Sequence, residues 1–495
     1  MKDSHDLTLL IKSRVPLIFL ETKEERQAIE LIKAVAENIA MPLHRWSITE
    51  GLSSLQRDYS NLTFGEYENN KEPQEVLEHI KKSLQKGLFI LADFHPYIKD
   101  PLHVRLIKDI AINYMAAERT IILLSHEISM PSELEKFSAN FELSMPSKEK
   151  IAKEVRAIAS TWSDENRGQK VKADKKAHTM LLDNLTGLSI TDVKRLARSA
   201  IYDDGAITES DIPEVLKAKY ELLNTGSILQ FEYETEQFSN VGGFRAVKQW
   251  LEYRKQAFFN EMPGLKPPKG MLLLGVQGCG KSLVAKAVAG IWGVPLLHLD
   301  FGTLFNKYHG ETEKNLRKAL QTAEIMQPCV LWVDEIEKAL GTSENDGGTS
   351  QRVLATLLTW LSEKTCSVFM VATANNIDSL PPELIRKGRF DEIFFVDLPR
   401  HSVRESIFRI HLKRRELDPE LFNLGDLAKV TKGFSGAEIE QAIVSAFYAS
   451  HSQGKEVNDQ SLLKAIEQTK PLSIVMAEPI ERLRQWAKDR TVSAD

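Results

Sequence analysis

Residues 275–282 are the segment of this chain with the clearest capacity for chemistry. They read Gly-Val-Gln-Gly-Cys-Gly-Lys-Ser, the G-x-x-x-x-G-K-S pattern of a phosphate-binding loop. In such a loop the glycines let consecutive backbone N–H groups turn inward around phosphate oxygens. Lys281 supplies a point charge, and the hydroxyl group of Ser282 can ligate Mg²⁺. The segment therefore predicts binding of a nucleotide together with a magnesium ion.

Two adjacent carboxylates are the second candidate for chemistry. Asp334 and Glu335 follow an apolar run at residues 329–333. Asp334 can hold Mg²⁺, directly or through water, and Glu335 can polarise the water that attacks the γ-phosphate. On its own the segment would be interpreted as an ordinary strand that runs into a capped helix. Because it follows a phosphate loop, the pair instead indicates nucleotide hydrolysis.

The phosphate loop needs a strand before it and a helix after it. Residues 271–274 are all apolar and predict a buried strand, while Leu283, Val284 and Ala287 begin an apolar series at helical spacing. The loop therefore joins a strand to the N-terminus of a helix, whose partial positive charge adds to the attraction for phosphate. This is the structural context that the motif requires.

The composition is that of an ordinary folded protein. The chain has 495 residues, of which 42% are hydrophobic and 27% charged, enough for roughly three folded units of about 150 residues each. A formal net charge of −5 gives no bulk attraction to nucleic acid, so we do not expect nucleic acid as a partner. No apolar run approaches the roughly 18 residues of a membrane span, and we expect neither a membrane span nor a secretory signal.

The cysteines indicate a reducing compartment. Cys279, Cys329 and Cys366 lack the spacing of metal ligands, which argues against a disulfide framework or a zinc site. We therefore expect a cytoplasmic protein, or a stromal one if it is encoded in a plastid. Cys279 lies in the phosphate loop beside Lys281, an environment that lowers the pKa of a thiol and would favour its oxidation. We prefer the simpler interpretation that Cys279 is a small residue at a tolerant position.

Residues 1–222 alternate apolar strands with amphipathic helices. This pattern predicts an α/β domain with a mostly parallel sheet. Three of its segments match later ones in the same order: Met41-Pro42-Leu43 matches 294–296, residues 129–134 match 379–384, and Gly187 matches Gly433. Such matches could arise because the strands of all α/β domains use similar residues. We favour an internal duplication, because the matches keep their order.

If the halves are duplicates, the first half has lost the chemistry of the second. Where the second half has its glycine-rich loop, residues 21–26 of the first are charged and contain no glycine. Where the second has its pair of carboxylates, the first has Asp93 followed by Phe94. We therefore expect no nucleotide hydrolysis here, and a structural, regulatory or partner-binding role instead.

Together these segments resemble the AAA+ ATPases, and within them the AAA subfamily with a second homology region. The resemblance covers about residues 239–470 and implies ATP and Mg²⁺ as cofactors, with Ser282 and Asp334 as metal ligands. The nucleotide-binding residues that it implies are Val241, Gly242, Gln277, Gly278, Cys279, Gly280, Lys281, Ser282, Leu283, Gly436 and Ala437. Over its whole length the chain is similar to the AAA family named for a hypothetical chloroplast open reading frame, found in plastids, cyanobacteria and other bacteria.

The resemblance also implies catalytic residues beyond the acidic pair. Residues 371–374 read as a strand that ends at Asn375, the family's sensor of the γ-phosphate. Arg386 and Arg389 resemble arginine fingers, which neutralise developing charge at the site of a neighbouring subunit. Surface salt bridges are the alternative role for both. The implied catalytic set is Lys281, Glu335, Asn375, Arg386 and Arg389, and the implied assembly is a homo-oligomeric ring, usually a hexamer.

Tyr308, His309 and Gly310 lie where the family carries its central pore loop. In that loop an aromatic residue grips an extended polypeptide. His309 departs from the usual aliphatic residue and could weaken the grip or make it pH-dependent, although we favour a tolerated substitution. Trp360 also departs, because many relatives have at this point an Asp-Gly element that communicates between subunits.

The predicted fold class is α/β. A P-loop AAA+ module, with a parallel sheet flanked by helices and a small helical lid, follows a degenerate AAA-like α/β domain. The predicted divisions are an N-terminal domain at 1–222, a linker at 223–238, a large ATPase subdomain at 239–398, a helical lid at 399–470 and an amphipathic helix at 471–495.

The predicted function is that of an ATP-hydrolysing ring that remodels a protein client. The alternative is a nucleotide-switched assembly scaffold that does not thread polypeptide. A nucleic-acid-dependent ATPase is a third possibility, against which the acidic charge balance argues.

Overall fold

The structure is a computed structural model of the chain, and it describes residues 2–58, 61–68, 70–83, 85–223, 228–232, 240–259, 261–305, 312–340, 349–386, 388–452 and 454–495. It divides the chain into two compact units. The first comprises residues 1–150 and 189–194, and the second comprises residues 151–188 and 195–495. The division therefore does not follow the predicted domain boundary at residue 222.

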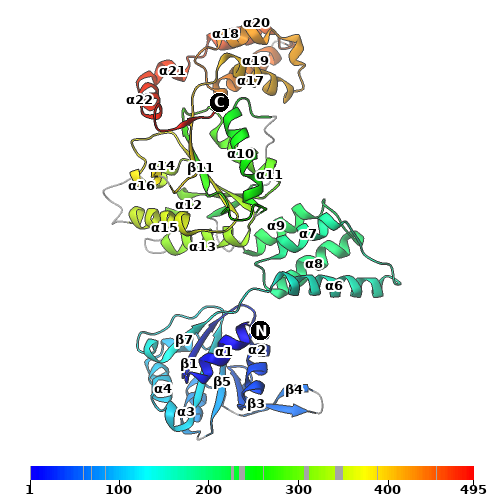
Figure 1. Ribbon diagram of the computed structural model, residues 1–495, viewed down its shortest axis with the longest axis vertical. Coiled ribbons are helices and arrows are strands. Elements are labelled where there is room, and N and C mark those ends of the chain that lie inside the picture. Colours follow the sequence, from blue (N-terminus) through cyan, green and yellow to red (C-terminus); the bar gives the residue numbers. More distant parts are fainter. Residues whose placement is uncertain are drawn as a thin grey trace. The chain divides into compact units, whose positions relative to one another are not determined.

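The first unit is a sheet between two layers of helices (Figure 1). Its strands are β1 (Leu17–Glu21), β2 (Leu43–Ser47), β3 (Gly51–Asp58), β4 (Asn61–Glu68), β5 (Gly87–Ala92), β6 (Arg119–Ser125) and β7 (Ser138–Phe141). Its helices are α1 (Lys2–Lys12), α2 (Glu25–Asn38), α3 (Pro73–Lys82), α4 (Pro101–Ile112) and α5 (Tyr114–Ala117). The short 3₁₀ turns η1 (Tyr97–Lys99) and η2 (Glu135–Phe137) lie between them.

Alternation along the strands produces the two layers of this unit. In β1, Leu17 and Phe19 pack with α3 and α4, whereas Ile18 and Leu20 pack with α1 and α2. Because successive side chains of a strand point to opposite faces, a continuous apolar run covers both faces of the sheet. The apolar strand segments of the sequence are therefore buried on both sides, as an α/β fold requires.

A helical region follows the first sheet and belongs to the second unit except for residues 148–150 and 189–194. It contains α6 (Lys148–Glu165), β8 (Lys172–Ala173), α7 (Lys175–Leu185), α8 (Ile190–Asp204), β9 (Ala206–Ile207) and α9 (Ile212–Leu223). Lys219 of α9 is fully buried and donates to the backbone oxygens of Thr186, at 2.9 Å, and of Ile325 in the ATPase region, at 2.8 Å. These bonds tie the helical region to the rest of its unit.

The larger part of the second unit is another sheet between helices. Its strands are β10 (Leu229–Glu232), β11 (Gly270–Gly275), β12 (Leu296–Leu299), β13 (Cys329–Val333), β14 (Val368–Ala374), β15 (Glu392–Val396) and β16 (Val492–Ser493). Helices α10 (Arg245–Phe258) and α11 (Lys281–Trp292) cover one face. Helices α13 (Thr312–Ile325) and α15 (Thr349–Glu363) cover the other, with the short helices α12 (Phe301–Phe305), α14 (Ile336–Leu340) and α16 (Pro382–Ile385) in the connections.

A small helical lid follows the sheet. It consists of α17 (His401–Lys413), the turn η4 (Pro419–Leu421), α18 (Leu424–Val430), α19 (Gly436–Ser452) and α20 (Asp459–Glu467). These helices share a separate apolar core that includes Phe408, Leu427, Ile443 and Leu462. Among the described residues, no helix combines the length and apolar character that a membrane crossing would need.

Two elements appear where the sequence predicted none. The predicted linker contains β10, in which Leu229 is buried and Leu229–Glu232 pairs antiparallel with β12. The predicted C-terminal helix is divided into α21 (Leu472–Val475) and α22 (Ala477–Ala487), and β16 then pairs in parallel with β15. Such short strands contain too few residues to show an alternation of apolar and polar side chains. They form because they pair with a strand that is distant in the sequence.

The two large sheets share one strand order. In the first, β2-β5-β6-β1-β7 are neighbours, and in the second β12-β13-β14-β11-β15, all parallel. The sequence matches fall at equivalent places in this order. Leu88 donates to the oxygen of Pro42 at 2.8 Å, and Val330 donates to that of Pro295 at 2.9 Å. This agreement supports the proposal of an internal duplication.

Candidate nucleotide-binding site

The phosphate loop connects the end of β11 to the start of α11. Gly278 and Gly280 have φ angles of 75° and 88°, a backbone region that favours glycine. Lys281 is buried, and its ammonium group donates to the backbone oxygens of Gly275 at 3.0 Å and Val276 at 2.8 Å. Burial lowers the pKa of Lys281 to about 8. The loop thus presents a helix N-terminus and a buried cation on one side of a cavity.

The hydroxyl group of Ser282 lies against the first carboxylate of the acidic pair. Ser282 donates to Asp334 Oδ1 at 3.1 Å, although the two residues lie on different elements, α11 and the end of β13. A serine hydroxyl and an aspartate carboxylate are oxygen ligands of the kind that Mg²⁺ takes. The sequence prediction of these two metal ligands therefore corresponds to two groups that are in direct contact.

Thr373 of β14 connects both members of the acidic pair. Its hydroxyl group donates to Asp334 Oδ1 at 2.5 Å and accepts from the backbone N–H of Glu335 at 2.9 Å. Thr373 is buried. Thr373 was not predicted as a site residue. The signal in the sequence is its position two residues before Asn375, in the strand that was predicted to end there.

Glu335 is held in place from two sides. Its backbone has a φ angle of 48°, which is unusual for a residue with a side chain. Asn375 Nδ2 donates to Glu335 Oε1 at 2.9 Å, and Lys338 forms an ion pair with Glu335 Oε2. The predicted sensor and the predicted water-activating carboxylate are therefore hydrogen-bonded to each other.

A further carboxylate beneath the site was not predicted. Glu337 is buried, and its Oε1 accepts from the backbone N–H of Asn375 at 2.8 Å. Burial raises the pKa of Glu337 above its usual range. Glu337 thus fixes the backbone at the end of β14, where Asn375 leaves the sheet.

The lid closes the cavity over the phosphate loop. The backbone N–H of Ala437, at the start of α19, donates to the oxygen of Gly278 at 3.0 Å. A Cβ atom on Gly278 would lie only 3.1 Å from the Cβ atom of Ala437. Gly242 approaches the lid similarly, because a Cβ atom there would lie 3.0 Å from Ile407 Cγ1. The absence of side chains at these positions permits the loop, the segment before α10 and the lid to meet.

One cavity of about 370 Å³ brings the predicted residues together. All of the predicted nucleotide-binding residues line it, and so do Asp334, Glu335 and Asn375. The lining residues that were not predicted from the sequence are Phe244, Thr373, Ile407, Ile410, His411, Arg414 and Glu440, and Asn240, next to the predicted Val241, lines the cavity as well. Most of these belong to the lid, whose approach to the loop is a tertiary feature without a local motif.

This donor set fits ATP and Mg²⁺. The loop offers backbone N–H groups and Lys281 to phosphate oxygens, while Ser282 and Asp334 offer oxygen ligands to the metal. The cavity is also within the usual size range of a small-molecule site, about 300 to 1,000 Å³. It can therefore take a nucleoside triphosphate with its phosphates toward the loop.

The predicted arginine fingers lie away from this cavity, in the connection between α16 and β15. Neither Arg386 nor Arg389 is among the described residues that line the cavity. Arg389 donates to the backbone oxygen of Leu358 in α15. Asp391 holds the same segment against the start of β11, since its carboxylate accepts from the backbone N–H of Gly270 at 2.9 Å. The phosphate loop follows the opposite end of that strand.

The structure corrects the expectation for Cys279 and does not describe the predicted pore loop. We expected the surroundings of Cys279 to lower its pKa, but burial raises the pKa of this thiol to about 12, and that expectation is wrong. Lys281 opposes the rise without overcoming it. Residues 308–310, the predicted pore loop, lie outside the described residues.

The chain belongs to the AAA ATPase family. A family model for the ATPase family associated with various cellular activities matches residues 271–398. Models for the N-terminal domain and the second domain of SpoVK-like AAA ATPases match residues 3–143 and 149–226. The last two matches separate the α/β sheet of the first unit from the helical region that follows it.

Within this family the chain is similar over nearly its full length to AAA domain-containing proteins named ycf46. It is 36% identical to that of Trieres chinensis, over 98% of this chain and 97% of the relative. It is 35% identical to that of Pyropia yezoensis, over 99% and 98%. A proteasome-activating nucleotidase from Aeropyrum pernix is 30% identical over 75% of this chain and 91% of its own length.

Proposed function

We propose that this chain is an Mg²⁺-dependent ATPase whose subunits complete one another's sites in a ring, with six members as the expected number. The observation that carries this proposal is the single cavity shared by the phosphate loop, the acidic pair, Asn375 and the lid. Among its polar side chains, Ser282 contacts Asp334 and Asn375 contacts Glu335, positions suited to holding the metal ion and to activating water.

Lys281 and the loop backbone would bind the β- and γ-phosphates, and Ser282 and Asp334 would hold the metal ion. When bound, Mg²⁺ neutralises charge on the transferred phosphoryl group. Glu335 would accept a proton from the attacking water, because its carboxylate lies within hydrogen-bonding reach of Asn375, the group that orients that water. Thr373 would hold the carboxylate of Asp334 and the backbone of Glu335 in fixed positions through its two hydrogen bonds.

The position of the arginine segment supports action in a neighbouring subunit. The strand β11 runs from Gly270, beside Asp391, to Gly275 at the phosphate loop. Five steps of about 3.3 Å place these ends roughly 16 Å apart. An arginine anchored near the first end is therefore poorly placed to reach the γ-phosphate of its own subunit. Arg386 and Arg389 would instead serve the site of the next subunit.

We further propose that the ring acts on a protein client, in the cytoplasm or in a plastid stroma. The similarity to a proteasome-activating nucleotidase over 91% of that relative supports this role. Tyr308 is the residue that would grip an extended polypeptide. We expect an unfolded polypeptide to stimulate the ATPase rate and Tyr308→Ala to abolish that stimulation. If the alternative scaffold role were correct, the polypeptide would leave the rate unchanged in the wild type and in Tyr308→Ala alike.

Steady-state ATPase activity of the full-length protein, measured against protein concentration with particle size in parallel, tests the proposal. We expect the rate per subunit to rise as the protein assembles. Glu335→Gln keeps the size and hydrogen-bonding oxygen of the side chain but removes the base, so it should bind ATP and lose at least about a hundredfold in kcat. Hydrolysis that is unaffected by Glu335→Gln, or a fully active monomer, would overturn the proposal.

A further inference from the structure

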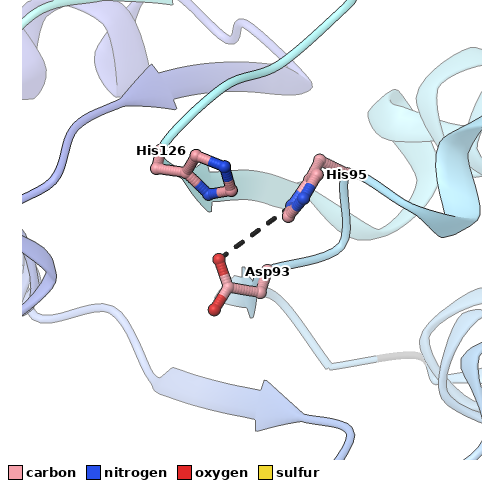
Figure 2. Close-up of side chains that lie close together, drawn as sticks. All are labelled: Asp93, His95 and His126. Atoms are coloured by element: carbon pink, nitrogen blue, oxygen red, sulfur yellow. Dashed lines mark ion pairs between the residues drawn. The ribbon is translucent and has the colours of Figure 1, made fainter. Parts of the chain in front are cut away.

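The first unit carries a cluster of ligand-type side chains at the edge of its sheet. Figure 2 shows Asp93, His95 and His126 directed toward one another. Asp93 and His95 follow β5, and His126 follows β6. Because β5 and β6 are parallel neighbours, their carboxyl ends meet at the same edge of the sheet, which is where α/β proteins bind ligands.

The three side chains are close enough to share one ion. One ligand atom from each lies within 4.8 Å of the others. His95 Nδ1 and Asp93 Oδ1 are 4.0 Å apart (Figure 2), and the two imidazole rings lie 4.7 Å apart between centroids at an interplanar angle of 85°. Ligand atoms about 2.0 to 2.2 Å from a tetrahedral metal are themselves roughly 3.3 Å apart. Shifts of about 1 Å in exposed side chains would therefore complete the geometry.

Ser125 supports the arrangement from within the cluster. Its hydroxyl group donates to Asp93 Oδ1 at 3.1 Å and lies 2.6 Å from His95 Nδ1. Asp93 and His95 thus converge on a single oxygen atom at the end of β6. These contacts hold the carboxylate of Asp93 and the imidazole of His95 beside each other, as the hydrogen-bonding partners around a metal site do for its ligands.

The backbone between the ligands is firmly held. Phe94, between Asp93 and His95, is 1% exposed and packs against the rings of Trp46 and Tyr97. The backbone N–H of Asp93 also donates to the oxygen of Leu124 at 2.8 Å. Asp93 and His95 therefore project from a backbone that the sheet and the core hold in place, and rotation of their side chains is enough to bring them to an ion.

We propose that Asp93, His95 and His126 bind a divalent transition metal ion, with Zn²⁺ as the first candidate. Imidazole nitrogens with one carboxylate suit Zn²⁺ and its neighbours in the first transition row, whereas Mg²⁺ and Ca²⁺ prefer sets of oxygen ligands. The side chain of Asp93 is 64% exposed and that of His95 29% exposed, so an ion can enter from solvent. Three protein ligands would leave a fourth position for water or a partner's side chain.

The site occupies the position that the ATPase half uses for its acidic pair. Asp93 follows β5 as Asp334 follows β13, and His126 follows β6 as Asn375 follows β14. The first unit would therefore hold a transition metal at the edge where the second unit is proposed to hold Mg²⁺. The inference depends only on the first unit and stands whether or not the chain hydrolyses ATP.

Isothermal titration of the tag-free, full-length protein with Zn²⁺, in excess Mg²⁺, tests the proposal. The variants are wild type, the double variant His95→Ala/His126→Ala, and His5→Ala, which removes an exposed histidine of the same unit outside the cluster. The double variant retains all three cysteines and the ATPase site, so zinc bound elsewhere is subtracted. Co²⁺ added in place of Zn²⁺ should give visible absorption bands that report nitrogen and oxygen ligands.

We expect wild type and His5→Ala to bind one equivalent of Zn²⁺ more than the double variant. If the double variant still binds this equivalent, its affinity should be at least about a hundredfold lower. The cobalt bands should disappear in the double variant. Thermal unfolding checks that the variants are folded, and His126→Asn, which keeps a polar side chain of similar size, replaces any variant that is not. Equal stoichiometry and affinity in wild type and the double variant would overturn the proposal, and so would a wild type that takes up no zinc.

Discussion

Lys281 of the proposed phosphate site carries a buried ammonium group, and burial determines its pKa. Its ammonium group is removed from water and is satisfied by the backbone oxygens of Gly275 and Val276. Removing the charge from water disfavours the protonated form and lowers the pKa to about 8. A nearby triphosphate would have the opposite effect, because an anion favours the protonated lysine.

Nucleotide binding should therefore depend on pH above about 8. Below this pH, Lys281 is charged in both the free and the bound protein, so affinity is at its highest and does not change through this group. Above it, the free protein must take up a proton to bind, and affinity should fall by up to about tenfold per pH unit.

Titration calorimetry with ATP at pH values of about 7 and 9, in buffers of different ionisation enthalpy, measures this proton uptake directly. We expect almost none from Lys281 at the lower pH and close to one proton at the higher. An affinity that stays constant across the range would show that phosphate does not interact with this charge.

At the scale of an element, the start of α19 determines how the lid meets the phosphate loop. Ser435 and Glu438 form reciprocal hydrogen bonds across the first turn: the N–H of Ser435 donates to Glu438 Oε2 at 2.7 Å, and the N–H of Glu438 donates to Ser435 Oγ at 3.3 Å. Glu438 Oε1 also accepts from the N–H of Leu472 at 2.6 Å. This is a capping box with an additional link to α21.

Glu438→Ala should loosen the lid and weaken ATP binding. The substitution leaves the N-cap Ser435 in place but removes the acceptor of two N–H groups, those of Ser435 and Leu472, and each such bond contributes about 0.5 to 1.5 kcal/mol. Gly436 and Ala437, which line the cavity, lie between Ser435 and Glu438. We expect a higher KM for ATP with a smaller change in kcat, measured by steady-state kinetics. Glu438→Gln is the matched control, because glutamine keeps one acceptor oxygen and can retain one of these two contacts, so it should lose less affinity than Glu438→Ala. Equal losses in both variants would point to the charge rather than the cap.

For the whole molecule, the separation of the arginines from the cavity of their own chain supports the proposal that the functional unit is an assembly of subunits. Within the described part of one subunit, all of the proposed phosphate and metal ligands line one cavity. The arginine segment is instead anchored at the far end of β11 through Asp391. A site with all of its proposed catalytic groups would then require two subunits.

Two inactive variants should therefore restore activity when they are mixed. Lys281→Ala cannot bind phosphate but keeps Arg389, while Arg389→Ala keeps its own site but lacks the finger. Random mixing in equal amounts gives about a quarter of interfaces with one intact site and one intact arginine. We expect measurable ATPase activity from the mixture and almost none from either variant alone.

The control for this experiment is the double variant Lys281→Ala/Arg389→Ala mixed with Arg389→Ala, which offers no intact arginine and should stay inactive. Co-purification of differently tagged subunits establishes that mixed assemblies form. Mixed assemblies without recovered activity would argue that Arg389 acts within its own chain.

Much of the candidate site could be predicted from sequence because its chemistry is local. The residues of the phosphate loop must be consecutive for their N–H groups to surround one phosphate, and Asp334 and Glu335 must end one strand. These constraints leave motifs that can be read without a structure. Every nucleotide-binding residue predicted in this way lines the same cavity.

Tertiary structure alone decided the features that join distant segments. Thr373 contacts the acidic pair only because β13 and β14 are neighbours in the sheet, and the lid residue Ala437 contacts Gly278 only because α19 folds back over the loop. Burial, which raises rather than lowers the pKa of Cys279, is likewise a property of the packed protein. The cluster of Asp93, His95 and His126 also exists only in the folded sheet, because β5 and β6 bring together residues that the chain separates by α4 and α5.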